Sequence, residues 1–143
     1  MLAVSGSFAG SIHMQSVIAL TDEPNHSLGV AEVQGTQSSS DPKWNNSSIT
    51  YWGTTDMQGT RGMQRGYFLN DHGAAGRDRG TFEGEVSIAG GELVVEGKWQ
   101  YTDGEGEYAG ITGSGTFTTR LTSPTTVEGN WQGTYSLAGA AGV

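Results

Sequence analysis

The sequence predicts an all-β protein, namely a single closed barrel of eight antiparallel strands, and three observations carry that prediction. Apolar and polar residues alternate with period two along the whole chain, and the alternating runs contain many β-branched and aromatic residues. Helix signals are nearly absent, because glycines interrupt every stretch that has apolar residues at helical spacing. Pro24, Pro42 and Pro124 all fall between the runs, where a missing N–H group costs no ladder hydrogen bond.

The alternation defines eight runs, and the apolar residues of each run predict which of its faces is buried. The first four runs are 5–20 (Phe8, Ile12, Met14, Ile18, Leu20), 27–37 (Leu28, Val30), 46–58 (Ile49, Tyr51, Met57) and 61–70 (Met63, Tyr67, Leu69). The last four are 78–88 (Phe82, Val86, Ile88), 92–102 (Leu93, Val95, Trp99, Tyr101), 111–121 (Ile111, Phe117, Leu121) and 126–137 (Val127, Trp131, Tyr135, Leu137). In the last three runs we expect polar side chains to face solvent at Glu96, Lys98, Gln100, Thr118 and Gln132.

Short connections favour a meander in which consecutive strands pair. Gly59-Thr60, Gly90-Gly91 and Ser123-Pro124 are short enough for hairpin turns, whereas 38–45, 71–76 and 103–107 are longer loops. Closing the meander removes its two edges and accounts for the many glycines inside the runs, since barrels use such glycines to bend strands. A β-sandwich has similar patterning and remains the alternative. The 143 residues support one domain, 1–143, and they include 24 glycines.

Composition excludes several classes of function. The net charge of −8 argues against nucleic acids and anionic membranes, because both need clustered basic residues. No cysteine is present, which excludes a disulfide scaffold, a thiolate metal site and a cysteine nucleophile. The three histidines are not paired at metal-binding spacing, so we expect no metal. The start of the sequence has neither a basic region nor a long apolar run, so we expect a cytoplasmic protein without a signal peptide.

The last third of the chain carries a family resemblance. Residues 103–117, DGEGEYAGITGSGTF, followed by 128–137, EGNWQGTYSL, resemble the allene-oxide-cyclase-like β-barrel superfamily. The middle stretches 65–72, RGYFLNDH, and 79–84, RGTFEG, are similar to its uncharacterised bacterial branch. The resemblance covers 27–137 and implies a small calycin-like barrel with an apolar cavity, whose characterised relatives guide cyclisation of reactive intermediates by shaping them. The plant cyclases use a carboxylate and a cysteine among other groups; this chain has no cysteine, so no catalytic residue is carried over.

Polar residues on predicted apolar faces are the main candidate site. Glu32 continues the face of Leu28 and Val30, Arg65 lies between Met63 and Tyr67, and Tyr51 follows Ile49. If these faces point inward, the lumen holds a carboxylate, a guanidinium and a phenol that could serve in acid–base chemistry. The alternatives are that Glu32 reaches water at a strand end, or that a bulge reverses its strand. Asp71 and His72 form a weaker candidate base at one mouth of the barrel.

These residues lead to three hypotheses. The first is a cofactor-independent isomerase, cyclase or related lyase that folds a hydrophobic small molecule in the lumen, with Glu32, Arg65 and Tyr51 as catalytic residues. The second is a lipocalin-like binder of a small hydrophobic ligand, and the third is a filled scaffold without a ligand. For the first two we expect a cavity of about 300 Å³ or more. We expect its lining to include Met14, Met57, Met63, Tyr67 and Phe117, and outer aromatics such as Trp52 to support a homo-oligomer.

Overall fold

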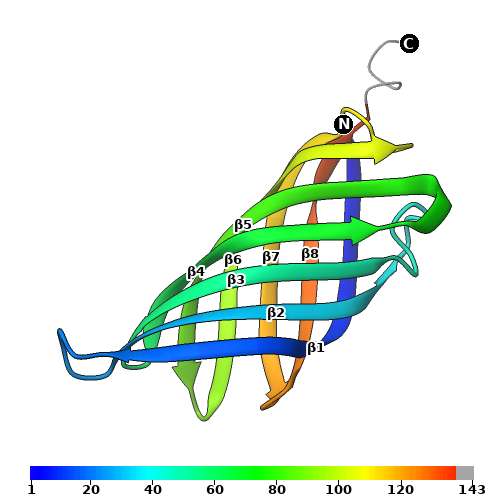
Figure 1. The fold of residues 1–143 in the computed structure, drawn as a ribbon. Coiled ribbons are helices and arrows are strands. Elements are labelled where there is room, and N and C mark those ends of the chain that lie inside the picture. The colour runs from blue at the N-terminus through cyan, green and yellow to red at the C-terminus, as the bar shows by residue number, and fades with distance from the viewer. Residues whose placement is uncertain (138–143) are drawn as a thin grey trace.

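The computed structural model describes residues 1–137, which form a closed antiparallel β-barrel (Figure 1). Its strands are β1 (Leu2–Leu20), β2 (His26–Ser39), β3 (Ser48–Gln58), β4 (Arg61–Asp71), β5 (Gly76–Ala89), β6 (Glu92–Gly106), β7 (Thr112–Ser123) and β8 (Thr126–Ser136), with a 3₁₀ turn η1 (Gly73–Ala75) before β5. Each strand pairs with the next, and β8 pairs with β1 to close the sheet. This topology confirms the predicted barrel of eight strands.

Large rings and glycines alternate on the inner wall of the barrel. A Cβ atom at Gly80 would lie 2.4 Å from the ring of Phe68, and one at Gly129 would lie 2.4 Å from the ring of Phe8. The Trp99 ring of β6 covers Gly115 on β7 and Gly133 on β8 in the same way. The lumen is therefore narrow because aromatic side chains fill the space that the glycines leave free.

A β-bulge reverses the predicted face of β1 halfway along the strand. The register with β2 shifts between Ile12 and Met14, so that Phe8 faces the lumen while Met14 and Ile18 face outward and are 66% and 63% exposed. The predicted inward position of Met14 is therefore wrong. Alternation alone could not locate this bulge, because apolar residues continue on both sides of it.

The faces of β2 and β4 are opposite to the predicted ones. The inward positions of β2 are Gly29, Ala31, Val33, Gly35 and Gln37, and those of β4 are Gly62, Gln64, Gly66, Phe68 and Asn70. The crowded inner wall demands small residues there; for example, a Cβ at Gly35 would lie 2.5 Å from the Ala9 carbonyl oxygen. Leu28, Val30, Met63 and Tyr67 consequently lie outside, whereas Val33 and Phe68 are the larger apolar residues of the two strands that lie inside.

The faces of β3 and β5–β8 match the prediction. Val95, Trp99 and Tyr135 are buried, while Glu96, Lys98, Gln100 and Gln132 are exposed and Thr118 is half-buried on the outer face. Strict alternation in these strands reflects a polar outer wall, which makes the inner residues recognisable.

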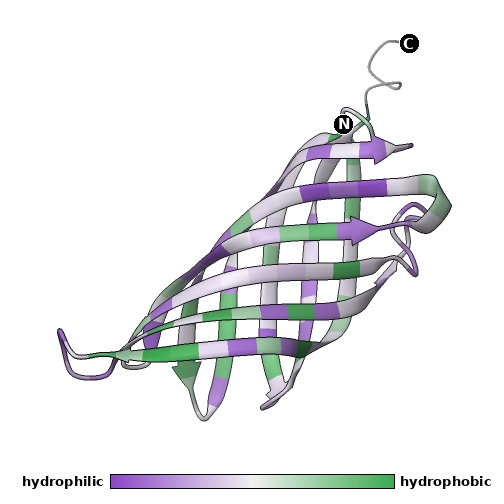
Figure 2. Cartoon of the chain, in the orientation of Figure 1, coloured by the Kyte–Doolittle hydropathy of each residue, from purple (hydrophilic) through white to green (hydrophobic). Residues whose placement is uncertain are grey.

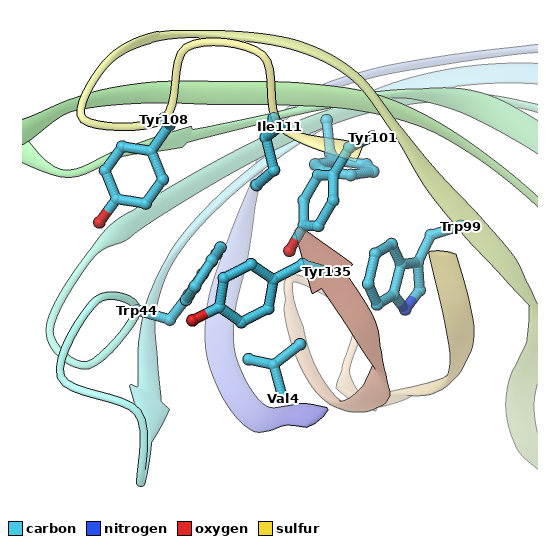
Figure 3. Packing of buried hydrophobic residues seen from close by; sticks show 8 residues of the cluster. Val4, Trp44, Trp99, Tyr101, Tyr108, Ile111 and Tyr135 are labelled. Atoms are coloured by element: carbon cyan, nitrogen blue, oxygen red, sulfur yellow. The ribbon is translucent and has the colours of Figure 1, made fainter. Parts of the chain in front are cut away.

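The two ends of the barrel differ. Residues 40–47 fold over one end and insert Trp44, which is fully buried, between Tyr101, Tyr108 and Tyr135 (Figure 3). The other end carries the hairpin turns, and there residues 14–20 of β1 extend beyond the ladder with β8 and pair with β2 (Figure 1). Apolar residues occupy much of this projecting part of β1 (Figure 2). The structure of residues 1–137 contains no helix with the length and apolarity that a membrane crossing requires.

Candidate functional site

An upper chamber of about 70 Å³ lies inside the barrel, next to the end that Trp44 closes. Aromatic rings form most of its wall, with polar amide and hydroxyl groups between them. The lining residues are Phe8, Gln37, Ile49, Tyr51, Gln64, Phe68, Asn70, Phe82, Trp99, Tyr101, Phe117, Thr119 and Trp131. The chamber is smaller than the cavity that the sequence-based hypotheses required, so it can take only a small group.

A lower chamber of about 220 Å³ continues the lumen toward the hairpin turns. Its wall is mainly aliphatic and includes Val33, Met57, Val86, Val95, Leu121 and Val127. Tyr51, Gln64 and Thr119 line both chambers and therefore form the constriction between them. A ligand that reaches the upper chamber from this side must pass these three side chains.

Tyr51 is the one residue of the predicted catalytic set that lies in the lumen. Its ring packs edge-on against Phe8 and Phe82, at centroid distances of 5.8 and 5.6 Å. Burial raises the pKa of Tyr51 above its ordinary value. Burial also raises the pKa of Tyr101, and the charge of Asp78 adds to the effect. Both phenols therefore stay protonated near neutral pH and can act as hydrogen-bond donors, but not as bases.

Glu32 and Arg65 lie on the outer wall, which corrects their predicted place in the lumen. The Glu32 carboxylate accepts a hydrogen bond of 2.7 Å from Trp52 Nε1 on the neighbouring strand and one of 3.3 Å from Gln34 Nε2. Arg65 is exposed and lies opposite Glu83 in the register of β4 and β5. The structure therefore separates both charged groups from Tyr51 by the thickness of the sheet.

The residues predicted to line the lumen divide in the same way. Phe117 lines the upper chamber and Met57 the lower one. Met14, Met63 and Tyr67 are 66%, 49% and 67% exposed on the outer wall, so their predicted lining role is wrong. In each case the cause is the reversed face of the strand described above.

A buried polar chain runs from the closed end of the barrel to the upper chamber. His72 Nε2 contacts Asp78 Oδ2 at 2.5 Å, and the Asn70 amide donates to Asp78 Oδ1 at 2.8 Å. Gln37 Nε2 in turn donates to Asn70 Oδ1 at 2.6 Å. Asp78 thus replaces Asp71 as the partner of His72, while Asp71 accepts a hydrogen bond from the backbone of Gly73.

This chain fixes the orientation of its two amides. The carboxylate of Asp78 accepts hydrogen bonds, so Asn70 turns its nitrogen toward Asp78 and its oxygen toward Gln37. Gln37 must then donate to Asn70, which leaves Gln37 Oε1 buried beside the chamber without a partner among residues 1–137. Burial raises the pKa of Asp78, and its contacts with His72 oppose that rise. The site therefore offers an acceptor to a ligand that carries a hydrogen-bond donor.

The sequence offered only weak signals for this chain. Gln37 and Asn70 occupy inward positions on strands whose inward face was predicted to be the outer one. Asp78 lies near the start of its strand between two arginines, a pattern that is typical of a surface residue. Trp44 had no predicted core position, because it lies in a polar loop. An apolar indole between Lys43 and Asn45 was the one available sign that this loop covers a core.

Fold and lumen together define the class of this protein: a closed barrel of eight antiparallel strands with an aromatic-walled internal chamber. No protein-family model matches the chain, and no curated protein has significant similarity to it. The resemblance to the allene-oxide-cyclase-like superfamily therefore stays a prediction, because the barrel topology agrees with it without identifying a particular superfamily. Within residues 1–137, no three His, Asp or Glu side chains are grouped so that they could hold a metal ion.

Proposed function

We propose that the barrel binds a small, mainly apolar ligand in its lumen and does not transform it. One observation carries the proposal: within residues 1–137, the wall of the upper chamber consists of rings, amides, hydroxyls and the aliphatic Ile49, without a carboxylate, imidazole or ammonium group. Such a wall provides contact area and a few orienting hydrogen bonds, as small-molecule sites do. It provides no group that exchanges a proton near neutral pH, since its phenols have raised pKa values.

The isomerase hypothesis has less support. Its acid–base residues were Glu32 and Arg65, and both lie on the outer wall. His72 and Asp78 are the nearest acid–base pair, but Asn70 and Gln37 stand between them and the chamber. Of the two hypotheses that place a ligand in the lumen, binding without catalysis therefore has the better support, although each chamber is smaller than the cavity expected for either.

The chamber also limits the kind of ligand. A single planar ring suits the edge-on aromatic wall, and a donor group on that ring would satisfy Gln37 Oε1. An apolar extension of the ligand would lie in the aliphatic lower chamber. Indole and phenol, which both combine one small ring system with a hydrogen-bond donor, are suitable probes.

Isothermal titration calorimetry with indole tests the proposal. We expect a Kd of about 1 mM or tighter for the unaltered protein, given the size of the probe. Phe117→Trp fills the upper chamber and should weaken binding at least tenfold, whereas Phe82→Ala enlarges the chamber and should strengthen it. Met63→Trp adds the same ring on the outer wall, and Glu32→Gln removes an outer charge; neither should change the affinity.

The filled-scaffold hypothesis predicts a different result. If neither the unaltered protein nor Phe82→Ala binds indole or phenol, the lumen is a packed core and the proposed function is wrong. Equal loss of affinity in Phe117→Trp and Met63→Trp would place the binding site outside the lumen and would also contradict the proposal.

A further inference from the structure

A large hollow lies on the outer wall of the barrel over β3–β7, and Phe82 and Trp99 line both this hollow and the upper chamber. The volume of the hollow is about 1050 Å³. Gly53, Gly66 and Gly115 form part of its floor; they occupy inward positions of their strands, so only backbone faces outward at these points. We call this hollow the outer groove; its walls are Trp52, Thr54, Arg65, Tyr67, Glu83, Lys98 and Gln100 together with nearby Thr and Ser residues.

Two aromatic rings stand exposed at one side of the outer groove. Trp52 and Tyr67 lie directly opposite each other on β3 and β4 and are 39% and 67% exposed. The hydrogen bond from Trp52 Nε1 to Glu32 holds the indole in one orientation. Among residues 1–137, neither ring stacks on another aromatic ring. Exposed aromatic rings that lie side by side can form a contact site, and both of these rings are partly open to solvent.

Charged and hydrogen-bonding groups cover the rest of the outer groove. Arg65, Glu83 and Lys98 occupy one row across β4, β5 and β6, and in the described part of the chain none of them forms an ion pair. Two cations thus flank one carboxylate, with Glu32 close by, so the outer groove is nearly neutral although the chain carries −8. Its donors and acceptors are consequently free to bind a neutral polar ligand.

The chemistry of the outer groove selects the ligand class. Exposed ring faces bind flat surfaces of C–H groups, while arginine, glutamate, glutamine and threonine side chains bind hydroxyl groups. A pyranose sugar presents both features, with C–H groups on its ring faces and hydroxyls at its edges. A nucleic acid or another polyanion would need a net positive surface, which this groove lacks.

We propose that the outer groove binds a neutral saccharide chain. One sugar face stacks on Trp52 and Tyr67, and the hydroxyls of neighbouring sugars bind Arg65, Glu83, Lys98 and Gln100. Glu32 is a positioning residue, because it acts on the ligand through the indole that it holds. This site opens on the outer face and shares only Phe82 and Trp99 with the lining of the upper chamber, and its proposal does not depend on the function proposed for the lumen.

Affinity electrophoresis tests the proposal, with gels that contain hydroxyethylcellulose, galactomannan or laminarin. We expect at least one of these polysaccharides to retard the unaltered protein. Trp52→Ala and Tyr67→Ala should each weaken binding to that polysaccharide at least tenfold. Met63→Ala removes another exposed outer side chain from β4, outside the groove, and should change the affinity less than twofold. Unchanged thermal midpoints would verify that the variants are folded.

Three results would overturn the proposal. The first is that none of the three polysaccharides retards the protein. The second is that Trp52→Ala and Tyr67→Ala migrate as the unaltered chain does. The third is that sedimentation shows a dimer that Trp52→Ala dissociates, in which case the outer groove is an interface between copies of the chain. Phe117→Trp, which fills the lumen, should leave saccharide binding intact and so separates this site from the lumenal one.

Discussion

At the scale of single residues, the most informative group is Asp78, a fully buried carboxylate that orients three polar side chains. It contacts His72 and Asn70 directly and Gln37 through Asn70. Because both of its oxygens are bonded, the orientation of Gln37 at the chamber wall depends on Asp78, which does not line the chamber itself. A residue remote from the ligand thus decides which hydrogen bond the chamber offers.

Asp78→Ala should lower the free energy of unfolding by about 2–4 kcal/mol, because it leaves His72 and Asn70 buried with unmet hydrogen bonds. Urea denaturation measures the loss. The control is Asp71→Ala at the end of β4, where the carboxylate is half-buried and accepts a hydrogen bond from the Gly73 backbone, and where we expect a loss below about 1 kcal/mol. Equal losses in the two variants would show that the buried chain does not stabilise the barrel.

At the scale of elements, His26 ties the β1–β2 turn to β3 through its side chain, in addition to the β2–β3 ladder and the hydrogen bond from Gln58 to the Pro24 carbonyl. His26 Nδ1 lies 2.8 Å from Asp22 and Nε2 lies 2.7 Å from Asp56. Both ring nitrogens face carboxylates, an arrangement that requires the doubly protonated imidazolium. The hydrogen bond to Asp22, followed by that to Asp56, raises the pKa of His26 above 6.5, and His26 lowers the pKa of Asp22 below 3.8.

The sign of these shifts defines the pH range in which the tie stabilises the hairpin. A raised histidine pKa gives stabilisation that is present below 6.5 and lost as pH rises through the raised value, whereas a lowered aspartate pKa gives stabilisation that is lost as pH falls below 3.8. Hydrogen exchange of the Gly59 amide, which bonds to the Asn25 carbonyl, should therefore be slower at pH 6 than at pH 9 after correction for intrinsic rates.

NMR titration of His26 provides the matched comparison. Asp22→Asn should lower the pKa of His26 more than Asp56→Asn does, because the Asp22 hydrogen bond contributes more to the shift. The opposite order, or no change in either variant, would contradict the described tie.

The same scale shows what could be predicted from the sequence. Existence, number and order of the strands followed from alternation and turn residues, and β6–β8 also revealed their faces, because their outer positions are polar. The faces of β2 and β4 could not be found in that way. Their inner positions hold glycines that make room for rings on neighbouring strands, and this demand arises only when the barrel closes.

For the candidate site, a residue was placed correctly where the buried face of its strand was predicted correctly, and wrongly where that face was reversed. Tyr51, Met57 and Phe117 come from strands with correctly predicted faces, and all three line the lumen. Glu32 and Arg65 come from β2 and β4, and both lie outside. The bulge after Ile12 likewise has no local signature, because Met14 and Ile18 are as apolar as the residues before it.

At the scale of the whole molecule, the barrel has one seam that differs from all its other strand pairs. Seven pairs join strands that follow each other in the sequence, whereas β1 and β8 join residues 2–11 with residues 126–135. Closing this pair requires ordering of nearly the whole chain, and the entropy of loop closure delays such contacts. The hairpins should therefore form first in folding, and the seam should form after the rate-limiting barrier.

Substitution of two buried valines tests this folding order, because each substitution should change a different rate constant. Val4 lies in the seam and is 5% exposed, while Val95 lies in the β5–β6 hairpin and is 3% exposed. Truncation of either valine to alanine should therefore lower the free energy of unfolding by a similar amount, about 2 kcal/mol. In stopped-flow chevron plots, Val4→Ala should accelerate unfolding and leave the folding rate nearly unchanged, whereas Val95→Ala should slow folding. Equal slowing of folding by both would mean that the seam is already closed at the transition state.

If the seam forms late in folding, the pairing of β1 with β8 sets the lifetime of the folded barrel. Strengthening that one strand pair then slows unfolding without altering how fast the chain folds.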